Sequence, residues 1–354
     1  MEFSYKFPVV RGYQASREYY IAMVPLKMLS RLFPGDDEYV PPEYRAQRRI
    51  NESRIPSIRQ YILNNRDSYV FSALSASIDG KFLFVPANSN SSVGILEVSL
   101  DAKFLINDGQ HRKAAILEAI AEDESLKDET ISIVFFEDSG LARSQQMFTD
   151  LNKHAVKTSN SIAELYDSRD ELAVITRKTI SQIPFLNRYT DKEKDILGKF
   201  SSNLFTLNTF YNANRRIVRQ TLSPQAAETF LLDYWSEVVN HILPWKELDS
   251  HLISKLDLRE KYIITQAVII QVFGRLGNYF VEHPEVDHKI VLARLEEIDW
   301  QRTSDTWKLR VIRSNGRMIN NESAIILTCN AIKQFLGIKL DPDEIKRENE
   351  FIGT

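Results

Sequence analysis

The chain has 354 residues, of which 43% are hydrophobic and 26% are charged, which is the composition of a soluble globular protein. The net charge of −3 excludes a uniformly basic nucleic-acid-binding protein, so a polyanion could contact only local basic segments. The single cysteine, Cys329, excludes an internal disulfide and a cysteine-based zinc site. Because no apolar run is long enough to cross a membrane and no apolar leader is seen, we expect a cytoplasmic protein without a membrane partner.

Alternating and helical apolar patterns are mixed over the first part of the chain. They predict strands at residues 3–10, 19–24, 69–71, 82–85, 93–98, 103–106 and 131–136. They predict helices at residues 25–33, 54–63, 109–120 and 140–151. Short strands interspersed with helices are typical of a compact mixed α/β domain, which we place at residues 1–200.

From about residue 160 the pattern is almost wholly helical. Helices are predicted at residues 161–182, 190–199, 223–240, 260–281 and 288–298, and residues 205–216 are predicted to form a polar-aromatic connector. All four tryptophans lie in this part of the chain, at Trp235, Trp245, Trp300 and Trp307. They and Cys329 are expected in the core. The predicted fold class is therefore α+β, with a helical C-terminal domain at residues 201–354.

Charges of opposite sign are segregated along the chain. Residues 41–66 carry six arginines against two glutamates, residues 301–317 carry five cations against one aspartate, and residues 208–220 carry three arginines and no acid. Residues 118–138 carry eight acids against Lys127. This favours a polyanion such as duplex DNA, whereas for any single segment a solvated helix face is the simpler interpretation. The candidate DNA-binding residues are Arg45, Arg48, Arg49, Arg54, Arg59, Arg215, Arg216, Arg310 and Arg313.

One turn lies between a predicted strand and a predicted helix. Residues 103–106 lead into Asn107, Asp108 and Gly109, and a helical apolar pattern begins at once. His111 and Arg112 then occupy the first helical turn, where the helix dipole already repels positive charge. A bound phosphate would reverse that penalty, because backbone N–H groups and an arginine fork would converge on it. The alternative is an ordinary strand–turn–helix with a solvent-facing Arg112.

The string Asp108-Gly109-Gln110-His111-Arg112 resembles the signature of the DGQHR-domain family, which includes the DndB proteins of the bacterial DNA phosphorothioation (sulfur modification) system. Two further blocks match the pattern of that family, at residues 47–62 and 146–159. The resemblance therefore covers three separated blocks in the first half of the chain, which is more specific than one pentapeptide.

This family is in turn similar to the ParB/sulfiredoxin superfamily, in which a comparable turn grips nucleotide phosphates at a helix N-terminus. The resemblance implies nucleotide or phosphate binding by Asp108, Gly109, Gln110, His111 and Arg112, with Asn152 and Lys157 as a second polar box. Gln110 stands where sulfiredoxin has its catalytic cysteine, so sulfiredoxin-type reduction is excluded.

Each of these residues also has a purely structural interpretation, and both sets of roles stay open. Asp108 would cap the helix instead of binding a ribose hydroxyl or Mg²⁺. His111 would be an ordinary surface or core histidine instead of a phosphate donor or general acid–base. Asn152 would end a helix, with Lys157 beside its dipole.

Two classes of function follow from the resemblance. The first is a DNA-binding regulator that binds the promoter of the phosphorothioation genes and controls the level of sulfur modification. Additional candidate partners are other proteins of that system and further copies of this chain. In that case arginines contact phosphates and a helix of the C-terminal half reads bases. The second is a nucleotide-binding enzyme or switch, in which Asp108 to Arg112 would bind ATP or a related nucleotide with Mg²⁺. An enzyme of this kind would also hydrolyse the nucleotide. No catalytic residue and no metal-ligand set can be assigned from the sequence.

Overall fold

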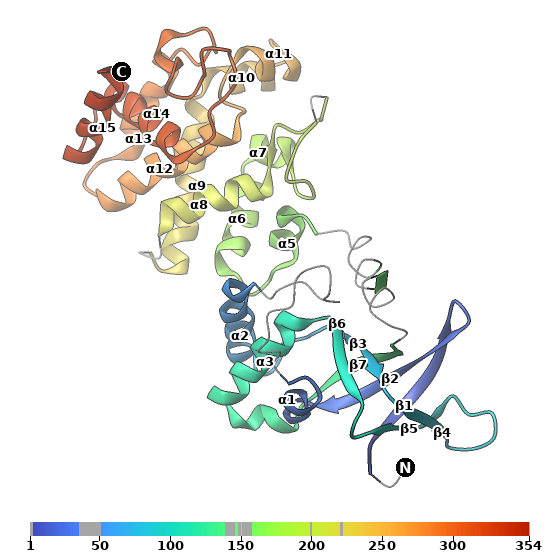
Figure 1. Ribbon diagram of the computed structural model, residues 1–354. Helices are drawn as coiled ribbons and strands as arrows, with labels where there is room; N and C mark the ends of the chain where they lie inside the picture. Colours follow the sequence, from blue (N-terminus) through green and yellow to red (C-terminus); the bar gives the residue numbers. More distant parts are fainter. Residues whose placement is uncertain are drawn as a thin grey trace. The chain divides into compact units, whose positions relative to one another are not determined.

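The computed structural model describes residues 3–34, 51–138, 146–147, 150, 158–198, 200–219 and 222–353 (Figure 1). The chain forms two compact units, Met1–Val156 and Lys157–Thr354. The sequence analysis placed the boundary at residue 200, whereas the two compact units meet between Val156 and Lys157. The reason is that the first helices after residue 158 pack on later helices and contribute Ile175, Ile180 and Leu186 to their core. Whether each unit is an independent functional domain stays a prediction.

The first unit is built on a seven-stranded mixed sheet with the order β4-β5-β1-β2-β7-β3-β6 (Figure 1). β3 and β7 are parallel, and the other pairings described in this sheet are antiparallel. Together with the helices of both units, this sheet confirms the predicted α+β class. The strands are β1 (Ser4–Gln14), β2 (Arg17–Pro25), β3 (Leu74–Asp79), β4 (Phe82–Pro86), β5 (Val93–Ser99), β6 (Lys103–Asp108) and β7 (Thr130–Glu137).

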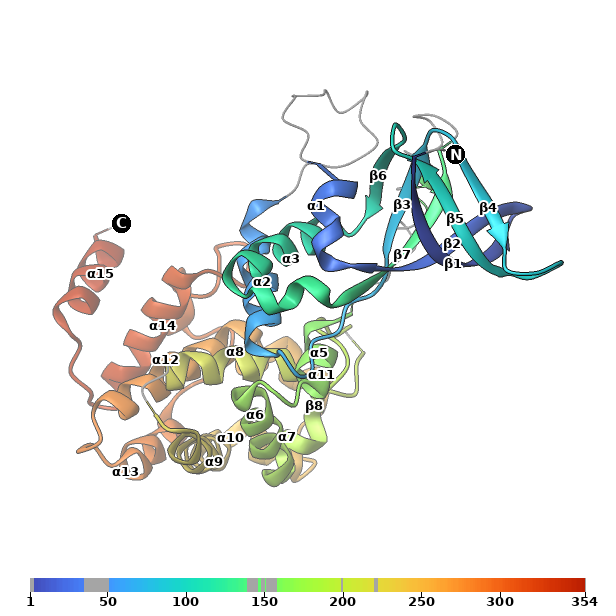
Figure 2. The ribbon, with the colours of Figure 1, turned by 90° about the horizontal axis from the view of Figure 1, so that it is seen from below.

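Helices cover one face of this sheet (Figure 2). Alternation along β2 turns Tyr20, Ala22 and Val24 into the core, as expected for a strand with one buried face. The covering elements are α1 (Leu29–Leu32), α2 (Ile55–Asn64), α3 (Gln110–Glu122) and the 3₁₀ helices η1 (Leu26–Met28) and η4 (Glu124–Asp128). The strand predicted at residues 69–71 is wrong, because these residues pair with no described strand and β3 begins at Leu74.

The second unit is mainly helical. Its described residues also include the two-residue strands β8 (Thr190–Asp191) and β9 (Phe205–Thr206) and isolated β-bridges such as Ile312 with Met318. Its helices are α5 (Asn160–Tyr166), α6 (Glu171–Gln182), α7 (Pro184–Tyr189), α8 (Leu207–Val218), α9 (Pro224–His241), α10 (Leu243–Asp249), α11 (Lys255–Lys261), α12 (Ala267–Glu282), α13 (His288–Leu292), α14 (Glu322–Phe335) and α15 (Pro342–Ile352). The 3₁₀ helices η5 (Ala293–Glu297) and η6 (Asp305–Trp307) complete it. No helix of the described part of the chain is both long and apolar enough to span a membrane.

Several predicted helix boundaries in this unit are wrong. The helix predicted at 161–182 is two helices, because Asp170 caps a new start, and the connector predicted at 205–216 is α8. The helix predicted at 260–281 is likewise divided into α11 and α12. Residues 190–198 form no helix. The core prediction is confirmed, since all four tryptophans and Cys329 are at most 2% exposed.

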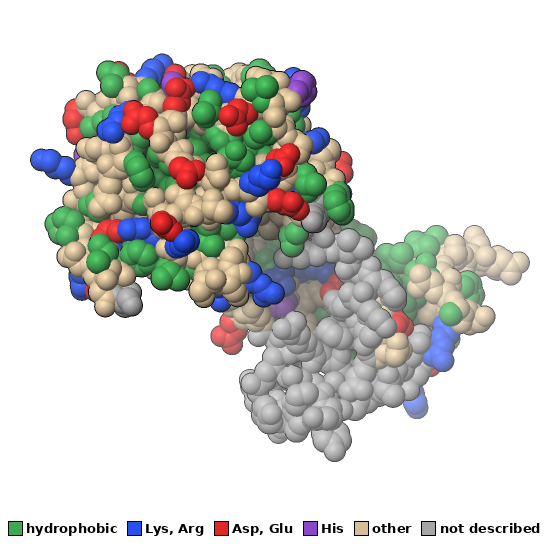
Figure 3. Space-filling model, turned by 90° about the horizontal axis from the view of Figure 1, so that it is seen from above, with side chains coloured by type: hydrophobic (Ala, Val, Ile, Leu, Met, Phe, Trp, Pro, Cys, Tyr) green, Lys and Arg blue, Asp and Glu red, His purple; other side chains and the backbone are tan. Residues whose placement is uncertain are grey.

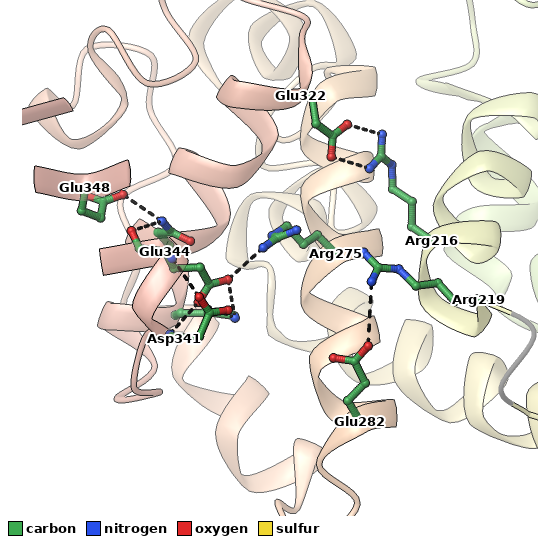
Figure 4. Close-up of polar contacts among 10 residues, drawn as sticks. Arg216, Arg219, Arg275, Glu282, Glu322, Asp341, Glu344 and Glu348 are labelled. Atoms are coloured by element: carbon green, nitrogen blue, oxygen red, sulfur yellow. Dashed lines mark hydrogen bonds and ion pairs between the residues drawn. The ribbon is translucent and has the colours of Figure 1, made fainter. Parts of the chain in front are cut away.

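The last helix, α15, is attached to the second unit mainly by charged side chains. Its Glu344 and Glu348 are 1% and 5% exposed, whereas its apolar Ile345 and Ile352 face solvent. Glu344 accepts from Lys333 at 2.7 Å and from Arg275 at 3.0 Å, and Figure 4 shows the Arg275 pair. Buried ion pairs of this kind fix one docking geometry, because any other would leave a charge buried without its partner.

Candidate functional site

The signature turn joins β6 to α3. Asp108 ends β6 opposite Ser75 of β3, and Gly109 is the N-cap of α3 with a φ of +103°. A Cβ on Gly109 would lie 2.3 Å from Cδ2 of Leu74, which is fully buried. Glycine is therefore required both by the left-handed backbone and by the close approach of β3. Asp108 does not cap the helix, since Gly109 is the N-cap and no side chain caps it.

Arg112 is bonded to protein groups on two sides. Its Nη2 donates to the Asp108 carboxylate at 2.5 Å. Its Nη1 lies 2.6 Å from the Ser72 carbonyl, 2.5 Å from the Ser72 hydroxyl and 3.0 Å from the Ala73 carbonyl. The side chain is 17% exposed. Arg112 thus ties the first turn of α3 to the segment that enters β3.

His111, in the same helical turn, makes a second contact with a distant segment of the chain. Its Nε2 accepts the backbone N–H of Asn51 at 3.0 Å, so this nitrogen must carry a free lone pair. Asn51 in turn caps the 3₁₀ helix η3 (Glu52–Arg54), which leads directly into α2. The imidazole therefore connects the start of α3 to the start of α2. Gln110, the first residue of α3, is partly buried.

Four chain segments meet at the signature turn: the end of β6, the start of α3, residues 72–73 and Asn51. The Asp108 carboxylate supplies the anion that the positive end of α3 favours, so the two basic residues there do not require an external ligand. A phosphate at this turn would have to compete with Asp108 for Arg112. Phosphate or nucleotide binding by Asp108 to Arg112 stays a prediction. Within the described ranges, no three His, Cys, Asp or Glu side chains are arranged to hold a metal ion.

Some predicted site residues fall outside the part of the chain that the structure describes. They are Arg45, Arg48 and Arg49 of the first basic segment, and Asn152 and Lys157 of the second polar box. Their predicted roles stay predictions.

Cations of the first unit neutralise much of its acidic segment. The pairs are Arg59 with Glu122 (2.7 Å) and Glu118 (3.8 Å), Arg66 with Asp123 (2.9 Å) and Glu129 (2.8 Å), and Lys27 with Asp128 (2.6 Å). Charges that are segregated along the sequence are therefore brought together by the fold. Arg59 links α2 to α3 instead of facing outward, whereas Arg54 is exposed and has no side-chain partner among the described residues.

Two of the arginines near the end of α8 are also paired. Arg216 forms a two-bond pair with Glu322, at 2.9 and 2.7 Å, and donates from Nε to Gln271 at 2.9 Å. Arg219 lies 3.8 Å from Glu282 (Figure 4). A DNA contact through Arg216 would break a bidentate pair, so this residue is better described as a link between α8, α12 and α14.

Arg215 differs from Arg216 because it is exposed. Its charge acts on the nearby Glu164 carboxyl, whose pKa is raised to about 7 by burial and by the charges of Asp195 and Asp170, with Arg215 opposing the rise. One oxygen of Glu164 is buried without a hydrogen-bond partner. Arg215 therefore faces solvent beside an acidic group, which reduces the local positive potential.

The third basic segment contains partly buried and exposed arginines. Arg310 donates to Glu348 at 2.7 Å and to the Leu327 carbonyl at 3.1 Å, and its side chain is 13% exposed. A contact between Arg310 and DNA would require breaking this pair. Arg313 is exposed. On the face drawn in Figure 3, basic and acidic side chains alternate instead of forming one field of a single sign.

Comparison with known families decides the identity of the chain. The family model described as DndB, DNA-sulfur modification-associated, matches residues 7–339. The chain belongs to the DndB family. Searches of curated proteins and of solved structures return no match. Membership of the DndB family implies involvement in a DNA sulfur-modification system.

The signature interactions could be anticipated only in part from the sequence. Asp108 and Arg112 are four residues apart, a spacing at which opposite charges on a helix pair, and this signal was available. Ser72, Ala73 and Asn51 are 39 to 60 positions away from the residues they contact and carry no local signal.

Proposed function

We propose that this DndB-family chain is a DNA-binding regulator that binds the promoter of the sulfur-modification genes and controls the level of modification. The observation that carries the proposal is the family match over residues 7–339, which implies involvement in DNA sulfur modification. Support comes from arginines that the fold leaves exposed in both units, namely Arg54, Arg215 and Arg313.

Nucleotide binding at the signature turn is the other function that the sequence predicts. No interaction among the described residues favours it over the internal ion pair of Arg112 with Asp108. We therefore retain it as a prediction and base the proposed function on DNA.

The proposal is tested with the full chain and two fluorescent duplexes of equal length, one from the promoter of the accompanying modification genes and one with the same bases scrambled. Anisotropy titrations from low to physiological salt give the affinity and the salt slope for each duplex. A regulator is expected to bind the promoter duplex at least about 1,000-fold more tightly than the scrambled one, with a negative salt slope for both. Equal affinity for the two duplexes would contradict promoter recognition, and no binding at low salt would contradict DNA binding altogether.

A further inference from the structure

A short β-hairpin in the second unit presents two arginines to solvent. Its arms are residues 311–313 and 317–319, and we call it the cationic hairpin. The Arg313 N–H donates to the Arg317 carbonyl at 2.8 Å, and the Gly316 N–H donates to the Arg313 carbonyl at 2.8 Å. Gly316 has a φ of +78°, which matches the glycine required in a three-residue hairpin loop.

The base of the hairpin is held firmly by the core of the unit. Val311 and Ile312 both donate from their backbone N–H groups to the carbonyl of Trp307, and Ile319 donates to the Val311 carbonyl. Trp307 is fully buried and stacks on Trp300 with ring centres 5.6 Å apart. Arg310, directly before the first arm, is fixed by Glu348. The tip is therefore presented on a rigid support.

The two arginines at the tip repel one another. Residues directly opposite on paired strands have Cβ atoms about 5 Å apart, and like charges in that position are destabilising. Arg313 and Arg317 are both exposed, and neither has a side-chain partner among the described residues. The sequence contains no acid between Asp305 and Glu322 that could relieve the repulsion. An anion between or beside the two guanidinium groups would turn this repulsion into attraction.

We propose that Arg313 and Arg317 of the cationic hairpin bind backbone phosphates of duplex DNA. A guanidinium fork matches the oxygens of a phosphate, and a two-stranded ribbon fits the major groove of B-DNA. The inference rests on the proposed function and specifies the element that contacts DNA. Ser314 and Asn315, the other residues of the loop, are exposed as well, so no apolar group at the tip hinders access to a charged groove.

The test compares three forms of the full chain on the scrambled duplex of the preceding experiment, over a salt series. Arg313→Ala/Arg317→Ala removes the two cations of the hairpin. Lys346→Ala/Arg347→Ala is the matched control, because it removes two exposed cations from α15. The hairpin variant is expected to bind at least about tenfold more weakly at low salt, with a salt slope reduced by about 1.8, since each phosphate contact contributes about 0.9. The control is expected to change the slope by less than half of that.

The outcomes separate this inference from the proposed function. If wild-type protein binds DNA and the hairpin variant binds with the same affinity and slope, the hairpin is not the contact and the proposed function stands. If both double variants lose affinity equally, the effect is one of net charge and the assignment is overturned. If the wild type binds neither duplex, both the proposed function and the inference are overturned. A third variant, Arg313→Lys/Arg317→Lys, keeps the charge and is expected to retain most of the slope with weaker binding, since an ammonium lacks the fork.

Discussion

Replacing Arg112 by alanine distinguishes a structural role of the signature from a phosphate-binding one. In the structure the guanidinium joins the Asp108 carboxylate and the carbonyls of Ser72 and Ala73. Hydrogen bonds to a charged group contribute about 1.5–3 kcal/mol each. Because Asp108 is 42% exposed, its pair adds at most about 1 kcal/mol. The contacts with Ser72 and Ala73 are all made by Nη1, so we count them together as one such bond. Adding the pair with Asp108, we expect Arg112→Ala to destabilise the first unit by roughly 2–4 kcal/mol without any ligand.

A phosphate-binding role alone predicts the opposite sign. Removing an unpaired cation from the positive end of a helix would leave the fold unchanged or stabilise it by a few tenths to about 1 kcal/mol. Arg59→Ala is the matched control, because Arg59 is also an arginine of the first unit that pairs with acids. Its pairs lie at the surface, so they contribute less than about 1 kcal/mol to the stability of the unit.

The assay must report on the first unit alone. All four tryptophans lie in the second unit, so their emission follows that unit and serves as an internal reference. Hydrogen exchange of β3, β6 and α3 reports the local opening free energy of the first unit. The structural account would be refuted if the opening free energy of the first unit in Arg112→Ala lay within about 0.5 kcal/mol of that in the control Arg59→Ala.

Three further predictions concern the signature, the acidic group near α8 and the last helix. Gly109→Ala is expected to destabilise the first unit by about 1–3 kcal/mol through backbone strain, with the Leu74 contact adding to it, and unchanged exchange protection would contradict this. The folded-state pKa of Glu164 is about 7, whereas an ordinary glutamate has a pKa of 4.5, so the folded state binds more protons than the unfolded state. Stability therefore falls as the pH rises from about 4.5 to 7. Glu164→Gln is expected to remove this dependence and, because the group is only partly buried, to gain only about 1 kcal/mol at pH 8. An unchanged pH profile in urea unfolding followed by tryptophan emission would oppose it. Glu344→Ala leaves Lys333 buried without its partner and is expected to cost about 3–5 kcal/mol and to increase hydrogen exchange in α15, which normal protection of that helix would disprove.

Apolar periodicity predicted most of the sheet, because strands with one buried face leave an alternating pattern. Tyr20, Ala22 and Val24 of β2 and Ile131, Ile133 and Phe135 of β7 are examples, and all are buried. The same reasoning failed where a short polar side chain interrupts a helix. In the helix predicted at 190–199, the Asp191 carboxylate accepts from the N–H groups of Glu193 and Lys194 and forms a turn instead.

The connector predicted at residues 205–216 failed for the opposite reason. Thr206 caps a helix there, and Leu207, Phe210 and Ala213 form its buried face, although asparagines between them obscure the pattern. At the signature, the sequence located the turn and the need for an anion beside Arg112. It could not show that the anion is Asp108, because the choice between an internal carboxylate and an external phosphate depends on packing against residues 72–74.

The central claim, control of the sulfur-modification genes through their promoter, is tested most directly with a reporter fused to that promoter. The chain is expressed in cells that lack the modification genes, and reporter output is compared with that of an unrelated promoter. A protein bound at the promoter competes with the polymerase, so we predict a severalfold decrease in reporter output for this promoter alone. Equal output with and without the chain, at protein levels confirmed by immunoblot, would contradict the account.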